Sequence, residues 1–319
     1  MKGKHKIVVK NNRVHYEFDI KRNITIIQGD SATGKTTLIN MLRQAENLGE
    51  SSGIDVISDV PCRVLEGKNW KIILENSLGN IFFIDEENLF INTEEFASMA
   101  KESDNYFVLI TRENLYNLPY SVDEIYGLHE SGKYHDTRKV YQQMYHIYSI
   151  EDRFPVEVEK IIVEDSKSGY EFFKDISTEK NITCLSAGGK SNLFSLVKKE
   201  STEEICIVAD GAAIGPEMNR LYKEAIKKKN IHLYLPESFE WLILKAGLVL
   251  DKDIRGVLEA PEKYIDSKEY FSWERFFTKL LISRTENTYL KYSKSKLNPN
   301  YLHEKNKERI INAMQGIKI

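Results

Sequence analysis

One eight-residue stretch near the N-terminus constrains the fold of this chain more than any other feature. Residues 29–36 read Gly-Asp-Ser-Ala-Thr-Gly-Lys-Thr, which is the pattern G-x-x-x-x-G-K-[ST]. The apolar run NITIIQ (23–28) precedes the loop and predicts a short strand, and the pattern TLINMLRQAENL follows and predicts a helix that ends near Gly49. A strand, a glycine-containing loop and a helix in this order predict a loop that wraps around phosphate groups.

Each residue type in this loop has a physical role in phosphate binding. Gly29 and Gly34 let the backbone curl so that its N–H groups point at phosphate oxygens, and the following helix adds the positive end of its dipole. We expect Lys35 to reach the β- and γ-phosphates and Thr36 to ligate Mg²⁺. The alternative is a chance glycine turn before a helix. The predicted ligands are ATP and Mg²⁺, and the residues expected to bind the nucleotide are Gly29, Asp30, Ser31, Ala32, Thr33, Gly34, Lys35, Thr36 and Thr37.

A second candidate element follows the apolar run IFFID (81–85), which predicts a buried strand that ends in Asp85, with Glu86 next. This arrangement resembles the Walker B motif of P-loop ATPases. The resemblance implies that Asp85 binds Mg²⁺ and that Glu86 polarises the water that attacks the γ-phosphate. Because Glu87 also follows, an acidic helix start after a buried strand is the alternative interpretation.

The run YFVLIT (106–111) predicts another buried strand, followed by Arg112. Its position resembles the sensor strand of P-loop ATPases, so Arg112 is a candidate sensor of the γ-phosphate or an arginine finger toward a neighbouring subunit. A surface arginine after a strand is equally compatible with the sequence. Continuous apolar runs of this kind are typical of a parallel sheet that is covered on both faces.

Two further features of the sequence bear on which class of P-loop protein the chain resembles. The predicted hairpin over 6–20, with its turn at Asn11-Asn12, resembles the start of ABC-type ATPases. The segment 185–190 (LSAGGK) looks like an ABC signature, but it follows the Walker B motif, whereas the ABC signature precedes it. We therefore expect a compact, ABC-related or minimal P-loop ATPase. Residues 50–61 are expected to form a loop, and the polar stretch 126–149 has no clear periodicity.

After Pro155 the pattern alternates regularly between strands and helices. The predicted strands are KIIVE, ITCLSA, EICIVAD and IHLYLPE, and a helical pattern follows each of them. Such alternation predicts a second open α/β sheet with right-handed crossovers. The fold class is therefore α/β: a P-loop domain over 1–152, a second α/β domain over 156–255, and a helical, basic C-terminal region over 256–319.

Acidic residues end several of the predicted strands in the second domain. Glu164 ends the first strand, Asp210 ends the third, and Glu240 comes shortly after the fourth. The carboxyl ends of parallel strands form the crevice of an open α/β sheet, and carboxylates gathered there suit Mg²⁺. The alternative is a generic α/β domain whose strands happen to end in acids.

This order resembles the Toprim fold, in which a strand ends in Glu, a glycine turn follows, and a later strand ends in Asp-x-Asp. The resemblance covers about residues 158–250 and implies that Glu164 and Asp210 are catalytic metal ligands, with Gly188-Gly189 as the turn. The second Asp of the pattern is Ala212 here, which leaves Glu217 or Glu240 as a substitute, or leaves a weakened site. Metal-activated water would then cleave a phosphodiester.

The charge and residue composition restrict which kinds of molecule the protein is expected to bind. The net charge is -3, so the whole chain is not the basic protein that nucleic acid attracts, although residues 279–319 hold nine Lys or Arg against three Asp or Glu. This tail, with Tyr292 and Tyr301, could follow a nucleic-acid backbone or only pack and solvate the protein. The three cysteines lack metal-ligand spacing, and no signal or membrane-spanning run is visible, which predicts a cytoplasmic protein with no membrane partner.

Together, the two halves resemble a shortened OLD-family (overcoming lysogenization defect) protein, with the ATPase first and the Toprim-like domain second. The resemblance implies an ATP-controlled, Mg²⁺-dependent nuclease that acts in defence against phage. The alternative is an ATP-driven regulatory protein that binds a partner and whose second domain has lost catalysis. A small-molecule kinase ranks last, because Asp85-Glu86 suits activation of water better than a phosphoryl acceptor. A homo-oligomer is expected, since P-loop sites are often completed across subunits.

Overall fold

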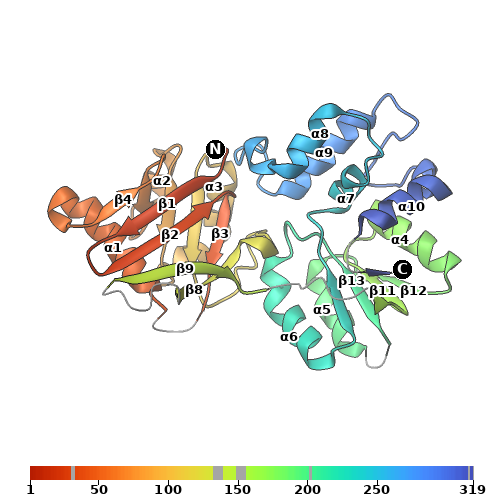
Figure 1. Ribbon diagram of the computed structural model, residues 1–319, viewed down its shortest axis with the longest axis horizontal. Helices are drawn as coiled ribbons and strands as arrows, with labels where there is room; N and C mark the ends of the chain where they lie inside the picture. Colours follow the sequence, from red (N-terminus) through yellow and green to blue (C-terminus); the bar gives the residue numbers. More distant parts are fainter. Residues whose placement is uncertain (30–32, 132–138, 149–155, 201–202, 315–316, 319) are drawn as a thin grey trace. The chain divides into compact units, whose positions relative to one another are not determined.

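The computed structural model describes residues 1–29, 33–131, 139–148, 156–200, 203–314 and 317–318, with only the backbone of 156, 317 and 318 (Figure 1). The chain divides into two compact units. The first unit comprises Met1–Ile147 and Pro261–Phe271, and the second comprises Tyr148–Ala260 and Ser272–Ile319. The predicted domain boundary, 152–156, falls almost wholly outside the described residues. The region 256–319 is not a separate unit but is divided between both.

A nine-stranded mixed sheet forms the first unit, in the order β4-β1-β2-β9-β8-β3-β7-β6-β5. The strands are β1 His5–Lys10, β2 Val14–Ile20, β3 Ile24–Ile27, β4 Asp55–Ile57, β5 Cys62–Val64, β6 Ile81–Ile84, β7 Tyr106–Ile110, β8 Ile125–Glu130 and β9 Val140–His146. The neighbours β5, β6, β7, β3 and β8 are all parallel, whereas β8–β9, β1–β2 and β1–β4 are antiparallel. The parallel core and the hairpin that the sequence predicts are therefore both present.

The central strands form because their side chains are apolar on both faces. Every residue of β6 is completely buried, and β3 and β7 are buried throughout. Helix α1 (Lys35–Leu48) presents Leu38, Ile39 and Leu42 to the same core and ends at Gly49, as the sequence predicts. Burial of such continuous apolar runs fixes β3 and β6, and therefore the two segments that follow them.

Several elements of the first unit differ from the sequence-based expectation. The predicted loop 50–61 contains the end of η1 (Gly49–Ser52) and strand β4, and the blurred stretch 126–149 contains most of β8 and β9. These strands alternate between buried and exposed side chains or lie at an edge, so they lack a continuous apolar run. Glu86-Glu87 begins a turn rather than a helix. The remaining helices are α2 (Trp70–Glu75), η2 (Leu89–Asn92), α3 (Glu94–Glu102), η3 (Val122–Glu124) and η6 (Pro261–Lys263).

The second unit contains the predicted parallel sheet, with four strands in the order β12-β11-β13-β14. The strands are β11 Lys160–Val163, β12 Thr183–Ser186, β13 Ile205–Val208 and β14 Ile231–Tyr234. The helices that connect them are α4 Ser168–Glu179, α5 Lys190–Lys199, and η5 Gly215–Glu217 with α6 Met218–Lys228. Because β12 lies on one side of β11 and β13 on the other, the order of strands reverses between β11 and β13.

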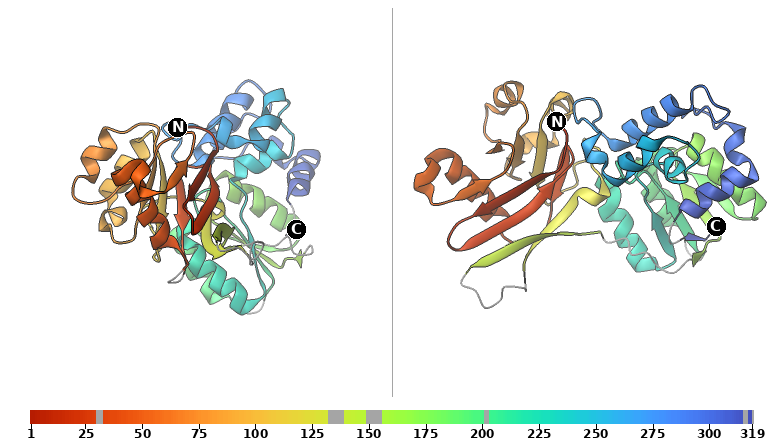
Figure 2. Two further views of the ribbon diagram at one scale, coloured as in Figure 1. Left: turned by 60° about the vertical axis from the view of Figure 1, so that its left-hand side comes forward. Right: turned by 45° about the horizontal axis from the view of Figure 1, so that its top comes forward.

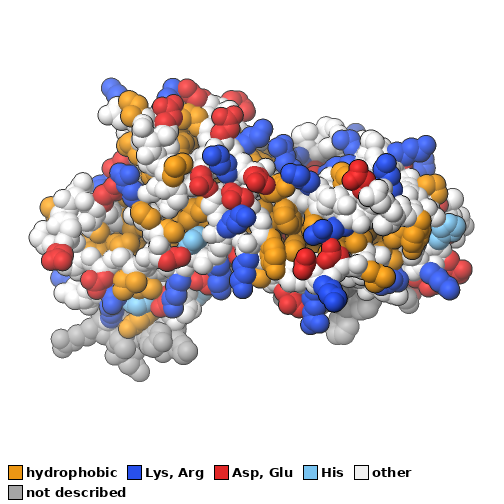
Figure 3. All heavy atoms as spheres, turned by 90° about the horizontal axis from the view of Figure 1, so that it is seen from above, with side chains coloured by type: hydrophobic (Ala, Val, Ile, Leu, Met, Phe, Trp, Pro, Cys, Tyr) orange, Lys and Arg blue, Asp and Glu red, His pale blue; other side chains and the backbone are white. Residues whose placement is uncertain are grey.

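The rest of the second unit is mostly helical (Figure 2). It comprises α7 Phe239–Lys245, α8 Lys252–Glu259, α9 Trp273–Thr285, η7 Pro299–Leu302, α10 Glu304–Ala313, and a small parallel pair, β10 Val156–Glu157 with β15 Ile317–Lys318. Helix α7 contacts both α9 and α10. Within the described residues, no helix is long and apolar enough to cross a membrane. Acidic and basic side chains are interspersed over the face seen in Figure 3.

Candidate functional site

The predicted phosphate loop borders a hollow of about 370 Å³ in the first unit. The loop leaves the carboxyl end of β3, and Gly34, with φ at 92°, immediately precedes α1. A side chain at Gly34 would meet the Tyr16 hydroxyl at 3.0 Å, so both conformation and space require glycine there. Of the predicted nucleotide-binding residues, Thr33, Gly34, Lys35, Thr36 and Thr37 line the hollow. Asp30, Ser31 and Ala32 lie outside the described residues.

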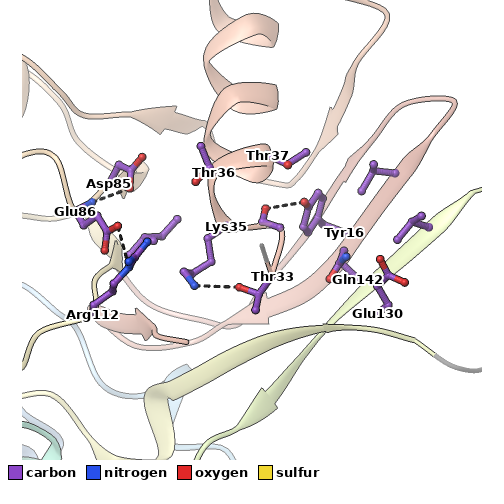
Figure 4. Close-up of a pocket in the computed structure, with 14 residues that line it drawn as sticks. Tyr16, Thr33, Lys35, Thr36, Thr37, Asp85, Glu86, Arg112, Glu130 and Gln142 are labelled. Atoms are coloured by element: carbon purple, nitrogen blue, oxygen red, sulfur yellow. Dashed lines mark hydrogen bonds and ion pairs between the residues drawn. The ribbon is translucent and has the colours of Figure 1, made fainter. Parts of the chain in front are cut away.

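Lys35 lies at the centre of this site (Figure 4). Its side chain is buried, with 6% of the residue exposed, and Nζ donates hydrogen bonds to the Gly29 carbonyl at 2.6 Å and to the Thr33 hydroxyl at 3.0 Å. The ammonium group therefore turns back over the loop instead of extending into solvent. Both acceptors are neutral oxygens, which phosphate oxygens can replace.

Tyr16, a residue that sequence reasoning missed, supports the loop. It comes from β2 and is completely buried, and its hydroxyl donates a hydrogen bond to the Gly34 carbonyl at 2.8 Å. Burial raises the pKa of Tyr16 to about 12, while a hydrogen bond with Thr37 acts in the opposite direction. The tyrosine thus holds the start of α1 against β2. The only signal in the sequence is the alternation of β2, which marks Tyr16 as an inward-facing residue without indicating its partner.

Asp85, Glu86 and Arg112 line the other side of the hollow (Figure 4). Asp85 and Glu86 directly follow β6, and the Glu86 N–H donates to Asp85 Oδ1 at 2.7 Å. Strand β7 lies between β3 and β6, which brings Arg112 between the loop and the acids. Arg112 Nε lies 3.1 Å from Glu86 Oε1. The sequence predicted a role for each residue separately, and the ion pair between Glu86 and Arg112 emerges only from the fold.

The oxygen donors for a magnesium ion lie at this same hollow. The Thr36 hydroxyl and the Asp85 carboxylate are hard oxygen ligands, the type that Mg²⁺ prefers. They come from the start of α1 and the end of β6, so the fold gathers two elements that are about fifty residues apart in the sequence. The residues present therefore fit a magnesium ion that accompanies a bound triphosphate.

The second unit brings together Glu164 and Asp210. They follow the adjacent strands β11 and β13, and the Asp210 N–H donates to Glu164 Oε2 at 3.1 Å. Burial is the main cause that raises the pKa of Glu164 to about 7, and Glu274 and Asp165 act in the same direction. Burial likewise raises the pKa of Asp210 well above its ordinary value, with further contributions from Glu274, Glu164 and Glu240. Carboxyl groups are therefore concentrated at this edge of the sheet, and burial favours their protonated, neutral forms.

Glu240 and Glu274 belong to the same acidic cluster, and the cation Lys294 contacts both of them. Lys294 Nζ lies 3.8 Å from Glu240 Oε1 and is hydrogen-bonded to Glu274. The Tyr292 hydroxyl donates to Glu240 Oε1 at 2.9 Å. Sequence reasoning missed Glu274, because an acid in the first turn of a helix usually serves the helix dipole and carries no signal for a site.

The position of the missing Asp is Ala212, and one of the two acids considered as its substitute, Glu217, pairs with another residue. Ala212, which stands in the second Asp position, is buried, and its N–H donates to the Glu237 carbonyl. Glu217 is paired with Arg220 on the next turn of the chain. The predicted glycine turn does reach the cluster, because the Gly189 N–H donates to the Glu164 carbonyl at 2.8 Å.

Part of the basic tail is buried in the second unit. Tyr292 and Tyr301, considered for stacking on bases, are buried, and the Tyr301 hydroxyl donates to the Leu290 carbonyl. Lys307 is also buried and forms ion pairs with Asp175 and Glu179 of α4. The tail folds against the second unit, so these residues serve its core and its ion pairs.

Within the described residues, no group of three or more His, Cys, Asp or Glu side chains is arranged to hold a metal ion as it stands. A comparison of the chain with protein-family models and with curated proteins found no match.

Proposed function

We propose that the first unit binds ATP with Mg²⁺ and hydrolyses it. The observation that carries this proposal is a single hollow with Lys35 and Thr36 on one side and Asp85, Glu86 and Arg112 on the other. The first pair supplies a phosphate-binding cation and a hydroxyl ligand, and the second group supplies a metal ligand, a base and a second cation. Together these are the parts that phosphoryl transfer to water requires.

The reaction follows from how these residues are held. Lys35 exchanges the Gly29 carbonyl and the Thr33 hydroxyl for the oxygens of the β- and γ-phosphates. Bound Mg²⁺, held by Thr36 and Asp85, would neutralise charge that develops on the phosphates. Glu86 must separate from Arg112 before its carboxylate can accept a proton from the attacking water. Arg112 is then available to stabilise the negative charge of the transition state.

A matched pair of variants tests hydrolysis. Glu86→Gln should retain ATP binding and lower the release of free phosphate by about 10²–10⁴-fold, the usual contribution of a general base. Glu87→Gln is the control, because Glu87 is the exposed neighbour on the same turn. Lys35→Ala should abolish binding. Unchanged turnover in Glu86→Gln would refute the assigned role, and a phosphorylated acceptor instead of free phosphate would identify a kinase.

We further propose that the second unit is a Toprim-like, metal-dependent nuclease whose cleavage the ATPase controls, in the manner of OLD-family proteins, and that it acts in phage defence. This candidate is favoured by the cluster of Glu164, Asp210, Glu240 and Glu274 at the strand ends. Burial and repulsion among these acids raise the pKa of Glu164 and Asp210, so a divalent cation bound beside them would favour their ionised forms. Such a cation would activate water for phosphodiester cleavage.

The runner-up is an ATP-driven regulatory protein whose second unit binds a partner without catalysis. It is favoured by Ala212, which replaces an expected acid, and by Lys294, whose ammonium already lies among the carboxylates. Cleavage of single- and double-stranded DNA and RNA with Mg²⁺ or Mn²⁺ distinguishes the two. Glu164→Gln and Asp210→Asn should abolish nuclease activity, whereas Glu308→Gln, at an exposed position of α10, should retain it. ATP turnover without cleavage of any of these substrates would favour the regulatory protein.

A further inference from the structure

One wall of the hollow in the first unit has no part in the proposed phosphate chemistry. It is formed by one face of three neighbouring strands, β2, β9 and β8. Val14 pairs with Val140, Tyr16 pairs with Gln142, and Gln142 pairs on its other side with Glu130. Residues directly opposite each other in a sheet share a face, and so do residues two apart on a strand. All five of these residues line the hollow.

Two acceptor groups stand on this wall, the Gln142 amide oxygen and the Glu130 carboxylate. Gln142 is buried, with 8% of the residue exposed, and within the described part of the chain no donor reaches its Oε1 atom. Its amide lies against the phosphate loop, since a Cβ atom on Gly34 would be 3.4 Å from Gln142 Cδ. The Glu130 carboxylate stands on the strand beside it and also only accepts when ionised. A buried acceptor without a donor costs about 1–3 kcal/mol.

Phosphate groups cannot satisfy these atoms, because phosphate oxygens are acceptors as well and the charge of Glu130 repels them. The phosphate-binding cations among the described lining residues are Lys35 and Arg112, away from this wall (Figure 4). A nucleoside, in contrast, has hydroxyl or amine donors, and its flat apolar faces suit Val14 and Val140.

We propose that the face formed by Val14, Val140, Gln142 and Glu130, the nucleoside wall, binds the nucleoside part of the triphosphate. Gln142 Oε1 accepts a hydrogen bond from a nucleoside donor, either a ribose hydroxyl or the exocyclic amine of the base. The inference rests on the proposed nucleotide site and deepens it, because it makes the protein selective for a nucleoside triphosphate over bare triphosphate.

Equilibrium binding in the Glu86→Gln background, where turnover is suppressed, tests this inference with Mg²⁺ present. Gln142→Leu should weaken ATP binding by about threefold to tenfold, the factor expected for one net hydrogen bond, and should leave inorganic tripolyphosphate binding unchanged. Glu130→Gln should act in the same direction. Gln143→Leu is the matched control, because Gln143 is exposed and lies on the opposite face of β9.

Three analogues identify the donor: 2′-deoxyATP, 3′-deoxyATP and inosine triphosphate, which lacks the amine. The analogue that lacks the donor should bind the Gln142→Leu variant and its parent equally. Equal loss of ATP and tripolyphosphate, an unchanged affinity for ATP, or the same loss with all three analogues would overturn the inference. If the parent binds tripolyphosphate as tightly as ATP, the inference about the nucleoside wall is refuted, whereas the proposed phosphate-binding site is retained. If it binds neither, the proposed function fails as well.

Discussion

Glu164→Gln should remove a pH dependence of stability from the second unit. In the folded protein, burial together with the nearby Glu274 raises the pKa of Glu164 from its ordinary 4.5 to about 7. The unfolded chain releases this proton near the ordinary value. Between these two pKa values the folded state therefore holds a proton that the unfolded state has lost, and stability falls as the pH rises through the window.

The size of the effect follows from the two pKa values. A rise from 4.5 to about 7 corresponds to roughly 3 kcal/mol of lost stability, complete above about pH 7 and absent below about pH 4.5. Asp210 adds to the loss in the same direction, because its pKa is also raised by burial and by neighbouring carboxylates. Glutamine keeps an oxygen that accepts the Asp210 N–H and carries no charge, so the variant avoids this cost at high pH.

The measurement is urea unfolding between pH 4 and pH 8 in a buffer with EDTA, so that no divalent cation compensates the acids. Trp241 and Trp273 report on the second unit, and a Trp70→Phe background removes the tryptophan of the first. The wild-type free energy of unfolding should fall by about 3 kcal/mol more than that of Glu164→Gln. Glu308→Gln, at an exposed position, should follow the wild type. The same pH profile in Glu164→Gln and in the wild type would refute the reasoning.

Three further changes have defined outcomes. Tyr16→Phe removes the donor to the Gly34 carbonyl and should weaken ATP binding about threefold to tenfold in equilibrium binding. Gly211→Ala places a Cβ atom 2.5 Å from the Leu235 carbonyl oxygen, which is backbone, and should cost about 1–3 kcal/mol in urea unfolding. Lys307→Met removes two ion pairs with α4 and should lower stability by about 1–2 kcal/mol, with less loss in high salt, because its partners are partly exposed. An unchanged affinity or unfolding midpoint contradicts the corresponding expectation.

The buried parallel strands could be predicted from the sequence because each is a continuous run of apolar residues. The runs at 81–84 and 106–110 are apolar on both faces and need no knowledge of their neighbours. Strands β8 and β9 could not be found in this way. They pair with each other and with β3 and β2, and they mix buried with exposed side chains, so they lack a continuous apolar run. Gln142 is a buried polar residue of β9 that lies beside Gly34 of the phosphate loop.

The candidate sites show the same division. The residues next to Lys35, Asp85 and Glu164 in the sequence identified these three as candidate site residues, because each follows a predicted strand or begins a predicted helix. Glu274 and Tyr16 have no such pattern. Glu274 joins the acids because α9 packs against α7, and Tyr16 reaches the loop because β2 lies in the same sheet as β3. Contacts between residues distant in sequence decide both placements.

By itself, the sequence determined an α/β chain with a phosphate-loop pattern, a strand that ends in Asp85-Glu86, and a second parallel sheet with acids at its strand ends. Periodicity and short motifs suffice for these features, because they depend on neighbouring residues. Only the tertiary structure decided that Arg112 pairs with Glu86 and that Lys294 contacts both Glu240 and Glu274. It alone decided that the buried Gln142 Oε1, which no donor of the described residues reaches, belongs to an amide beside the phosphate loop. Each of these depends on which strands and helices become neighbours, and burial then sets the charge and hydrogen bonding of the groups that meet.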